Sequence, residues 1–406
     1  MRTMKLSSLG TLRNGMNYDK SSAKRGCKII GVADFAGHVF PDYSTLSEID
    51  TSIVSKDDLL KDGDILFVRS NGNKNLVGRT MYIYGITEPI CYSGFCIAFR
   101  PDVTLVCPEY LFYALRAPFC KKQYSYSQQT NITNLSQGVL GAVEVPIPDL
   151  DTQRKLAKIL FALDQKISLN THICSELESM AKTLYDYWFV QFDFPDENGR
   201  PYRASGGEMV WNPQLKREIP KGWESGKLSD IANITMGQSP AGESYNETGD
   251  GMVFYQGRTD FGMRFPTTRM YTTAPTRFAH KGDILLSVRA PVGDLNIAME
   301  DCCIGRGLAA LKSKVGSQMY VFYTLSGLKP IFDVMDGNGT TFGSITKDTL
   351  FGLNVVIPTN FQLQKFEKRV KPMEDQIQIC EQENRELIKL RDWLLPMLMN
   401  GQAQVE

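Results

Sequence analysis

The sequence predicts an α+β fold in which two similar, mixed and strand-rich globular domains are separated by two long helices. Three observations lead to this prediction. Short phrases recur in the same order in both halves of the 406 residues, and a seven-residue apolar period follows each set of phrases. Between the phrases lie short β-branched and aromatic runs bounded by turn residues, which are typical of strands.

The repeat consists of three pairs of similar phrases, and the separation within a pair falls from 222 to 219 to 210 residues along the chain. The pairs are "KLSSLGTLRNG" (5–15) with "KLSDIANITMG" (227–237), "GDIL" (63–66) with "GDIL" (282–285), and "VPIP" (145–148) with "VVIP" (355–358). The order is the same in both halves, so the pattern indicates a duplication with small loop insertions in the first copy.

A seven-residue period sustained over four spacings is typical of a coiled-coil seam. The stretch from Asp151 to Trp188 would make a helix about 57 Å long at ~1.5 Å per residue, too long to bury its seam on its own small domain. The alternative is an ordinary amphipathic helix lying on a core. The predicted seam consists of Leu156, Leu163, Asn170, Leu177 and Leu184 in the first helix, and of Phe366, Met373, Cys380, Leu387 and Leu394 in the second.

Two residues make special demands on these helices. Pro372 is expected to kink or locally break the second helix near its start, because proline lacks the N–H group that the helix needs. Asn170 lies on the predicted seam, where it either fixes the register of the pair or is a tolerated polar residue.

The predicted segments are a globular domain over 1–150, a long helix over 151–191, a linker over 192–222, a globular domain over 223–358 and a long helix over 359–406. The linker is rich in glycine, proline and charge, as a domain connection should be. In both globular domains an apolar, aromatic run indicates short helices, and the two runs, 108–124 and 318–335, occupy corresponding places in the two copies.

The composition indicates an ordinary soluble protein with 42% apolar and 22% charged residues. No run approaches the ~18 apolar residues of a membrane span, and the first residues lack the apolar core of a signal peptide. Nine cysteines without dense regular spacing favour a reducing cytoplasm over a disulfide framework.

The formal net charge is zero, which counts mildly against a nucleic-acid binder unless the charge is segregated. Some segregation is visible in the sequence. Residues 110–143 contain no acidic residue but do contain Arg116, Lys121 and Lys122, and residues 258–277 hold four arginines against one aspartate.

Motifs of known catalytic chemistry are missing from the sequence. The cysteines and the three histidines have no zinc-ligand spacing, and no phosphate-binding Gly-x-x-x-x-Gly-Lys-Ser/Thr loop or Gly-x-Ser-x-Gly elbow occurs. No nuclease-type acid and lysine cluster and no Asn-Pro-Pro-Tyr methylation tetrad occurs either. We therefore expect no catalytic residue, no metal and no cofactor on this chain, and a bipartite recognition device instead.

The linker "FDFPDENGRPYRASGGEMVW…IPKGW" and the helix entry "VPIPDLDTQRKLAKIL", continued by "LDQKISLN", resemble the specificity subunit of type I restriction-modification systems. The resemblance covers essentially the whole chain. The second helix departs from it, since Phe361-Gln362-Leu363-Gln364 stands where "LDTQRK" stands in the first.

The resemblance implies that the globular domains are target-recognition domains, each reading one half of a split, asymmetric sequence in double-stranded DNA. It implies that the helices form an antiparallel intramolecular coiled coil with pseudo-two-fold symmetry, which sets the unread gap. Two modification subunits would dock along it and methylate adenine with S-adenosylmethionine, and restriction subunits driven by ATP and magnesium could join them.

Candidate DNA contacts are polar residues in loops that leave short strands, because base edges are read by such side chains and phosphates only position the protein. They are Arg69, Ser70, Asn71, Asn73, Lys74, Gln128, Gln129 and Asn131 in the first domain, and Arg258, Thr259, Arg264, Arg289, Thr340 and Thr341 in the second. For each residue the alternative is a solvated loop or turn position. The repeated Gly-Asp-Ile-Leu is predicted to be a shared turn and core strand, with the sequence diverging just beyond it.

Two other hypotheses remain at this point. The chain could be a duplicated coiled-coil scaffold that binds protein partners without reading DNA, which the zero net charge supports. It could also be an enzyme whose site belongs to no motif considered above.

Overall fold

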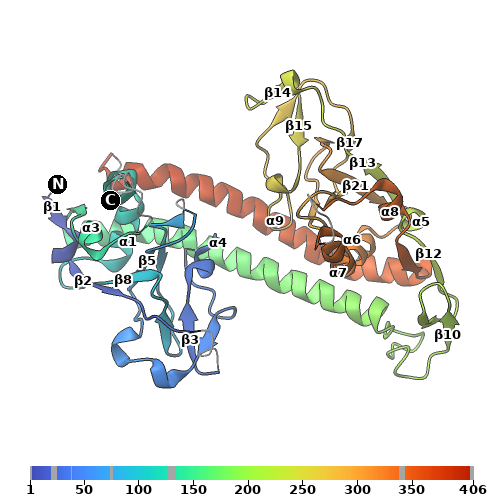
Figure 1. The fold of residues 1–406 in the computed structure, drawn as a ribbon, viewed down its shortest axis with the longest axis horizontal. Coiled ribbons are helices and arrows are strands. Elements are labelled where there is room, and N and C mark those ends of the chain that lie inside the picture. The colour runs from blue at the N-terminus through green and yellow to red at the C-terminus, as the bar shows by residue number, and fades with distance from the viewer. Residues whose placement is uncertain are drawn as a thin grey trace. The chain divides into compact units, whose positions relative to one another are not determined.

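The computed structural model describes residues 2–19, 25–37, 39–73, 76–125, 134–337 and 343–402. The chain divides into two compact units, which we call unit 1 (Met1–Thr171 and Glu383–Glu406) and unit 2 (His172–Gln382). The long helices α4 (Leu150–Tyr185) and α9 (Asn360–Met399) are therefore each divided between the units (Figure 1). The sequence had assigned these helices to segments of their own.

The described residues of unit 1 form two small sheets and one separate strand pair. The first sheet is antiparallel with the order β2 (Gly10–Asn14), β8 (Cys96–Pro101), β5 (Ile65–Val68) and β6 (Thr80–Tyr82). The second has the order β4 (Ser47–Ile49), β3 (Cys27–Ile30) and β7 (Ile90–Tyr92), with β3 and β7 parallel. The pair is β1 (Arg2–Lys5) with β9 (Glu144–Ile147), and the short helices are α1 (Pro108–Arg116), α2 (Pro118–Ser125) and α3 (Gln137–Gly141).

Unit 2 repeats the strand order of the first sheet, and its second sheet has five described strands where that of unit 1 has three. Its first sheet has the order β13 (Ala232–Met236), β21 (Leu308–Ser313), β18 (Ile284–Ser287) and β19 (Leu295–Ile297). Its second has the order β14 (Tyr245–Asn246), β16 (Tyr271–Thr272), β15 (Met252–Tyr255), β20 (Cys302–Ile304) and β17 (Phe278–Ala279), again with a parallel pair, β15 and β20. Unit 2 also contains the pair β12 (Glu224–Lys227) with β22 (Asn354–Ile357) and the helices α5 (Leu228–Ile231), α6 (Gln318–Gly327), α7 (Lys329–Gly337) and α8 (Lys347–Phe351). The predicted duplication is confirmed.

The repeated Gly-Asp-Ile-Leu forms the same turn and core strand in both units, as predicted. Gly63 and Gly282 have φ angles of 90° and 88°, a conformation that favours glycine. The carboxylate of Asp64 accepts a hydrogen bond from the backbone N–H of Lys61 at 2.8 Å. In unit 2, the carboxylate of Asp283 accepts the equivalent hydrogen bond from the backbone N–H of His280 at 2.8 Å. The Ile-Leu pair that follows is fully buried in each unit.

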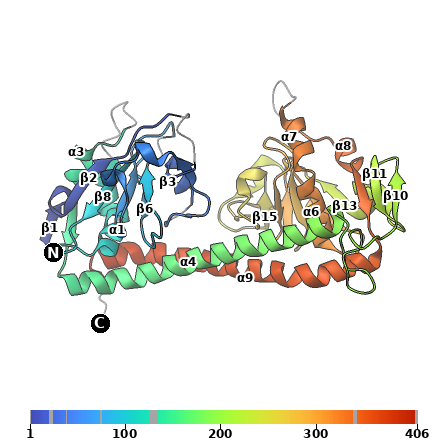
Figure 2. The ribbon, with the colours of Figure 1, turned by 90° about the horizontal axis from the view of Figure 1, so that it is seen from below.

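The helices pack against each other in an antiparallel manner within unit 1 (Figure 2). Asp164 of α4 contacts Arg391 of α9. Asn170, which comes later in α4, contacts Glu383, which comes earlier in α9. The side-chain amide of Asn170 donates to Glu383 Oε2 at 2.8 Å and to Asn384 Oδ1 at 3.0 Å. These bonds join the two helices at a buried position, so Asn170 acts as a register-fixing residue.

Unit 2 shows the same antiparallel pairing. Cys174 on α4 lies against Ile377 on α9, and the rings of Tyr185 and Phe366 lie 6.2 Å apart further along. None of the ten residues of the predicted seam is exposed. The antiparallel helix pair is as predicted, and the assignment of each of the ten residues to its seam stays a prediction.

The predicted local break at Pro372 is wrong, because α9 continues through it, and the alternative, a kink, stays a prediction. Val370 and Ile377 on either side are at most 1% exposed and belong to the core of unit 2. Their burial offsets the ~3 kcal/mol that a proline costs within a helix, since tertiary packing supplies most helical stability.

The linker is also more structured than a simple connection. It contains the hairpin β10 (Met209–Asn212) and β11 (Arg217–Pro220). The ring of Phe194 stacks on Tyr202 at 4.7 Å and on Trp223 at 5.0 Å. These rings pack with the core of unit 2, so the linker is a folded part of that unit.

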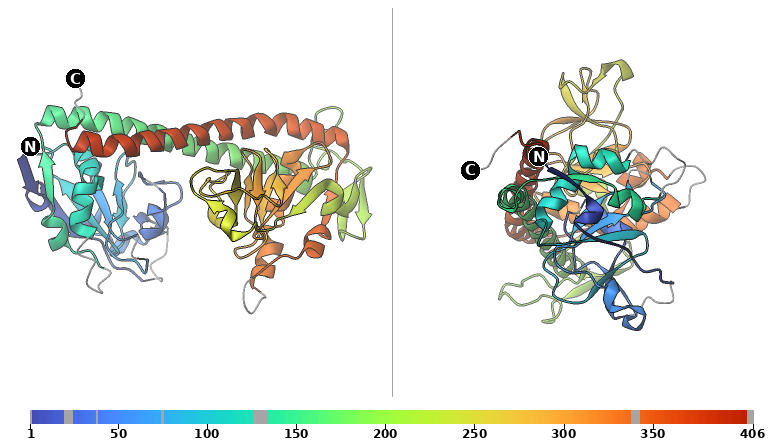
Figure 3. Two further views of the ribbon diagram at one scale, coloured as in Figure 1. Left: turned by 90° about the horizontal axis from the view of Figure 1, so that it is seen from above. Right: turned by 90° about the vertical axis from the view of Figure 1, so that its left-hand side faces the viewer.

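A buried carboxylate on the long helix anchors each unit. In unit 1, Asp164 of α4 is 1% exposed, and it accepts hydrogen bonds from Tyr113 Oη of α1 and from Arg391 Nη1 of α9, both at 2.7 Å. Within this unit the ribbons of α4 (green) and α9 (red) lie side by side (Figure 3). Burial, together with the Asp164 carboxylate, raises the pKa of Tyr113, so the hydroxyl stays a donor. This contact fixes α1 against both helices.

We predict that Arg391→Met leaves the Asp164 carboxylate buried without its cation, and lowers the free energy of unfolding by about 3–5 kcal/mol. The matched control is Lys389→Met, two residues away on the exposed face, which should change it by less than about 0.5 kcal/mol. Chemical denaturation of both variants measures the difference. Equal stabilities of the two variants would contradict the anchoring role of Asp164.

Candidate nucleic-acid interface

In each unit the chain that leaves the core strand pairs with a segment far away in the sequence. In unit 1, Ser70 forms an isolated antiparallel bridge with Asn134, and the N–H of Leu135 donates to the carbonyl of Arg69 at 2.8 Å. These contacts place Arg69 and Ser70, the first of the residues predicted to contact DNA in unit 1, against residues 134–135.

Unit 2 forms the same bridge between Arg289 and Ser344, and the N–H of Ile345 donates to the carbonyl of Val288 at 3.0 Å. The bridge shows that Arg289 occupies the place of Ser70. Arg69 and Arg289, which follow the repeated Gly-Asp-Ile-Leu in the two units, are therefore shifted by one residue and are not equivalent.

A tight turn completes the arrangement in each unit. In unit 1 this turn lies between β7 and β8, at residues 93–95. The carbonyl oxygen of Phe95 accepts hydrogen bonds from the N–H groups of Arg69 and Ser70, at 2.8 and 3.3 Å. In unit 2 the turn lies between β20 and β21, at residues 305–307. The carbonyl oxygen of Gly307 accepts a hydrogen bond from the N–H of Val288 at 2.9 Å. We call these the unit 1 turn and the unit 2 turn.

A repeated glycine makes room for each turn. A Cβ atom on Gly15 would lie 2.2 Å from the carbonyl oxygen of Ser93, and one on Gly237 would lie 2.2 Å from that of Gly305. The two glycines end the first pair of repeated phrases. The repeated phrases at 5–15 and 63–66 thus lead to the same turn, as do their counterparts in unit 2.

The predicted residues of unit 1 differ in their surroundings. Arg69 is half-buried, with Nη1 3.5 Å from the carbonyl of Gly94, and Ser70 is also half-buried. The side chain of Asn71 accepts from the N–H of Asn73 at 2.8 Å, as a turn former does, and Asn73 is exposed. The other predicted residues of this unit, Lys74, Gln128, Gln129 and Asn131, lie outside the described residues.

In unit 2 the prediction for Arg264 is corrected. Its side chain is 1% exposed, with Nη2 3.2 Å from Glu178 of α4 and Nε 3.7 Å from Glu374 of α9, and its guanidinium lies 4.2 Å from the ring of Phe322. A cation enclosed by helix carboxylates and an aromatic ring does not reach a DNA base, so Arg264 anchors the unit to its helices.

The remaining predicted residues of unit 2 are accessible. Arg258 is exposed and donates to Asp294 Oδ2 at 2.7 Å, Thr259 is exposed and accepts from Arg269 at 3.3 Å, and Arg289 is exposed. Thr340 and Thr341 lie outside the described residues. The excess of arginines in 258–277 is largely neutralised by ion pairs, since Arg269 pairs with Asp260 as well.

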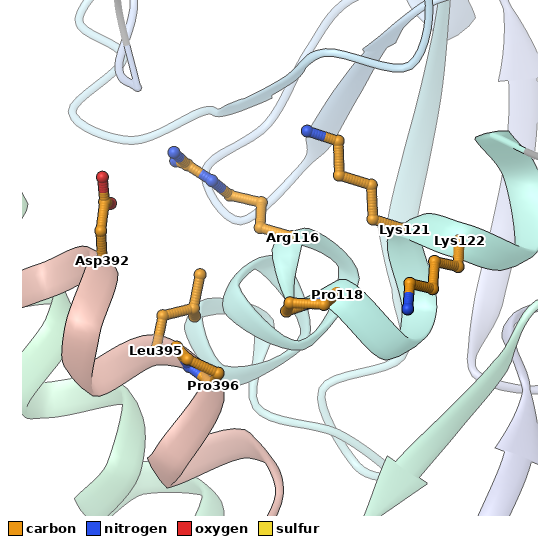
Figure 4. A pocket seen from close by; sticks show the side chains of 7 residues that line it. All are labelled: Arg116, Pro118, Lys121, Lys122, Asp392, Leu395 and Pro396. Atoms are coloured by element: carbon orange, nitrogen blue, oxygen red, sulfur yellow. The ribbon is translucent and has the colours of Figure 1, made fainter. Parts of the chain in front are cut away.

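The cations of the acid-free stretch in unit 1 gather at a cavity instead of a loop. Arg116, Lys121 and Lys122 line a cavity of about 450 Å³ together with Asp392 and residues near the end of α9 (Figure 4). Burial lowers the pKa of Arg116, and its Nη1 atom has no hydrogen-bond partner. In Figure 4, Arg116 and Lys121 extend to one side of α1 and α2, and Lys122 to the other.

Within the described ranges, no three histidine, cysteine or acidic side chains are placed to hold a metal ion. The same residues include no helix long and apolar enough to cross a membrane.

Sequence reasoning missed the exposed tips of the two turns. Phe95 is 61% exposed in the unit 1 turn, and Arg306 is exposed in the unit 2 turn. The signal that could have found them is a fourth pair of similar segments, "GFCIAF" with "RGLAAL", separated by 212 residues, which continues the falling separation of the other pairs. The match is too weak to see without the strand pairing.

The chain matches known proteins over most of its length. A family model described as type I restriction modification DNA specificity domain matches residues 1–179 and 220–389, one segment in each half. A protein of Methanocaldococcus jannaschii, described as putative type I restriction enzyme MjaX specificity subunit, is 30% identical over 98% of this chain and 92% of its own length. The HindI specificity subunit of a type I restriction enzyme from Haemophilus influenzae is 24% identical over 84% of this chain and 87% of its own.

A solved structure shares the fold. The crystal structure of a type I restriction-modification system S subunit from M. genitalium is similar with a TM-score of 0.57 at 17% identity, over 98% of this chain and 95% of that chain.

We predict that Gly15→Ala destabilises unit 1 by about 1–3 kcal/mol, because the added Cβ forces the turn backbone to move. Gly72→Ala in the neighbouring loop is the matched control, since its Cβ would meet nothing within 4 Å, and its effect should stay below about 0.5 kcal/mol. Thermal denaturation compares them. A Gly15→Ala protein as stable as Gly72→Ala would show that the turn is not held where the contacts place it.

Proposed function

This chain belongs to the family of type I restriction-modification DNA specificity subunits, and from that premise we propose that it reads a bipartite, asymmetric DNA sequence. Each unit would read one half-site of double-stranded DNA. The observation that carries this proposal is the common scaffold with divergent loops: both units use the same strand order and the same bridge, and they differ in the residues beyond it.

The division of labour within each unit follows from general rules of DNA recognition. Cations position a protein on phosphates, and bidentate or apolar contacts to base edges specify sequence. In unit 1, Arg69, Ser70 and Asn73 are the described candidates for such contacts. In unit 2 they are Arg258, Thr259 and Arg289, and the proposal extends to Lys74, Gln128, Gln129, Asn131, Thr340 and Thr341.

We infer that the catalytic chemistry belongs to partners. Two modification subunits would carry S-adenosylmethionine and methylate adenine, and restriction subunits would use ATP and magnesium, with the assembly working in the cytoplasm. The helices offer apolar surface for such partners, because Met180 of α4 and Ile379 of α9 in unit 2 are 54% and 59% exposed. In unit 1, Leu169 of α4 and Trp393 of α9 are 54% and 60% exposed.

A scaffold that binds only proteins is the second candidate, and the ion pairs of unit 2 favour it. Arg258 pairs with Asp294 and Arg269 with Asp260, which leaves less positive charge for phosphates. The Arg258–Asp294 pair is partly exposed and therefore weak, so DNA phosphates can compete for Arg258. Asp260 is buried, so its pair holds Arg269 more firmly.

We predict that the chain, complexed with its modification subunit, shifts DNA carrying the target sequence in a gel, and that binding weakens steeply as salt increases. Each phosphate contact contributes about −0.9 to the slope of log K against log salt concentration. Scrambled DNA of equal length is the control. Binding that is absent, or equally strong on scrambled DNA, would favour the protein scaffold.

We also predict that exchanging residues 1–150 for the corresponding segment of another specificity subunit changes one half-site and leaves the other unchanged. The reason is that the strands, bridge and turn of unit 1 are complete within that segment. The donor should carry a tyrosine at the place of Tyr113, which preserves the bond to Asp164. A change in both half-sites on sequencing methylated DNA would refute independent reading.

A further inference from the structure

We propose that the unit 1 turn and the unit 2 turn are a further DNA-contacting element, and that the two units use it with opposite chemistry. Phe95 would make an apolar contact with a base in the first half-site, and Arg306 would donate hydrogen bonds in the second. The inference rests on the proposed function and adds a specificity-determining residue to each unit.

The unit 1 turn is held in place by its backbone. The N–H of Ser93 donates to the carbonyl of Ile30 at 2.9 Å, and the N–H of Gly94 donates to the carbonyl of Met16 at 2.7 Å. The N–H of Cys96 donates to the carbonyl of Ser93 at 2.8 Å, which closes the turn. The carbonyl oxygen of Phe95 accepts hydrogen bonds from the N–H groups of Arg69 and Ser70. A turn whose backbone is fixed in this way needs no reordering of that backbone on binding, which lowers the entropic cost.

Phe95 is the exception among the apolar residues around it. Tyr92 and Cys96 on either side of the turn are at most 2% exposed, whereas Phe95 is 61% exposed. A single exposed apolar residue is common on protein surfaces and means little alone. Phe95, however, is the residue whose carbonyl oxygen accepts hydrogen bonds from Arg69 and Ser70. Ser70 also forms the bridge with Asn134. The ring therefore stands where the loops of the proposed interface meet.

The unit 2 turn keeps the scaffold and changes the side chains. The N–H of Gly305 donates to Tyr255 at 2.8 Å and that of Leu308 to Gly305 at 3.0 Å, which repeats the bonds of Ser93 and Cys96. Gly307 takes the place of Phe95, and the exposed Arg306 takes the place of Gly94. An aromatic ring is thus replaced by a guanidinium at the tip of the same turn.

These side chains suit different features of DNA. A phenylalanine contacts the methyl group of thymine in the major groove or enters between bases as a wedge. An arginine bonds to the edge of guanine or to a phosphate. Two turns that share backbone hydrogen bonds can therefore contribute to two unlike half-sites, as an asymmetric target requires.

The test selects methylated sequences from a DNA library in which both half-sites are randomised, using the full chain with its modification subunit. The variants are Phe95→Ala and Arg306→Ala, with Phe119→Ala as the control, because Phe119 is 49% exposed on α2 of the same unit. Melting temperature and gel filtration of each complex verify that the variants fold. Domain exchange in the wild type assigns each half-site to its unit.

We expect Phe95→Ala to relax the base preference at one or two positions of the unit 1 half-site, and to weaken binding roughly 10-fold if a base is stacked. Uracil in place of thymine at that position should reproduce the loss if the methyl group is contacted, and increased 2-aminopurine fluorescence in the wild-type complex would indicate a wedge. Arg306→Ala should either change one position of the unit 2 half-site or reduce the salt slope by about 1.

Unchanged preferences and affinities in both folded variants would overturn the inference while leaving the proposed function intact. Effects equal to those of Phe119→Ala, or changes in the half-site of the other unit, would overturn it as well. A wild-type complex that selects no bipartite sequence would instead contradict the proposed function.

Discussion

The buried carboxylate on each long helix is the constraint on which the arrangement of each unit depends. Asp164 and Glu374 are 210 residues apart and occupy the same place in the repeat, as do Tyr113 and Tyr323. Burial raises the pKa of Glu374, and Arg264 opposes that rise. A carboxylate in such a place needs its cation, because an unpaired buried charge costs several kcal/mol. The loops of each unit are therefore positioned relative to helices that are themselves fixed.

The cation beside the carboxylate differs between the units. In unit 1 Arg391 of α9 donates a hydrogen bond to Asp164, whereas in unit 2 Arg264 of the globular part lies 3.7 Å from Glu374 without a hydrogen bond. The cation comes from a different element in each unit, so the duplicated scaffold has tolerated divergence even in its core. Replacing such buried pairs by apolar residues is often neutral for stability, which suggests that their value here is in fixing one orientation.

Local periodicity explains what the sequence could predict. The heptads of α4 and α9, the Gly-Asp-Ile-Leu turn and the strand-rich halves all follow from neighbouring residues. The burial of Arg264 does not follow from neighbouring residues, because its partners Glu178 and Glu374 lie on helices that are distant in the sequence. The unbroken helix at Pro372 depends on packing, and the shift between Arg69 and Arg289 depends on strand pairing. The turn residues Phe95 and Arg306 became visible only through the carbonyls that the turns offer to neighbouring loops.

The central claim is that two units of one scaffold read two different half-sites and leave the chemistry to a partner. Single-molecule sequencing of methylated adenines tests it most directly, in cells that express the chain with its modification subunit and in cells that express the chain alone. The account predicts a single bipartite motif with a constant gap in the first case and no methylation in the second. A continuous motif, a motif with two identical halves, or methylation by the chain alone would contradict it.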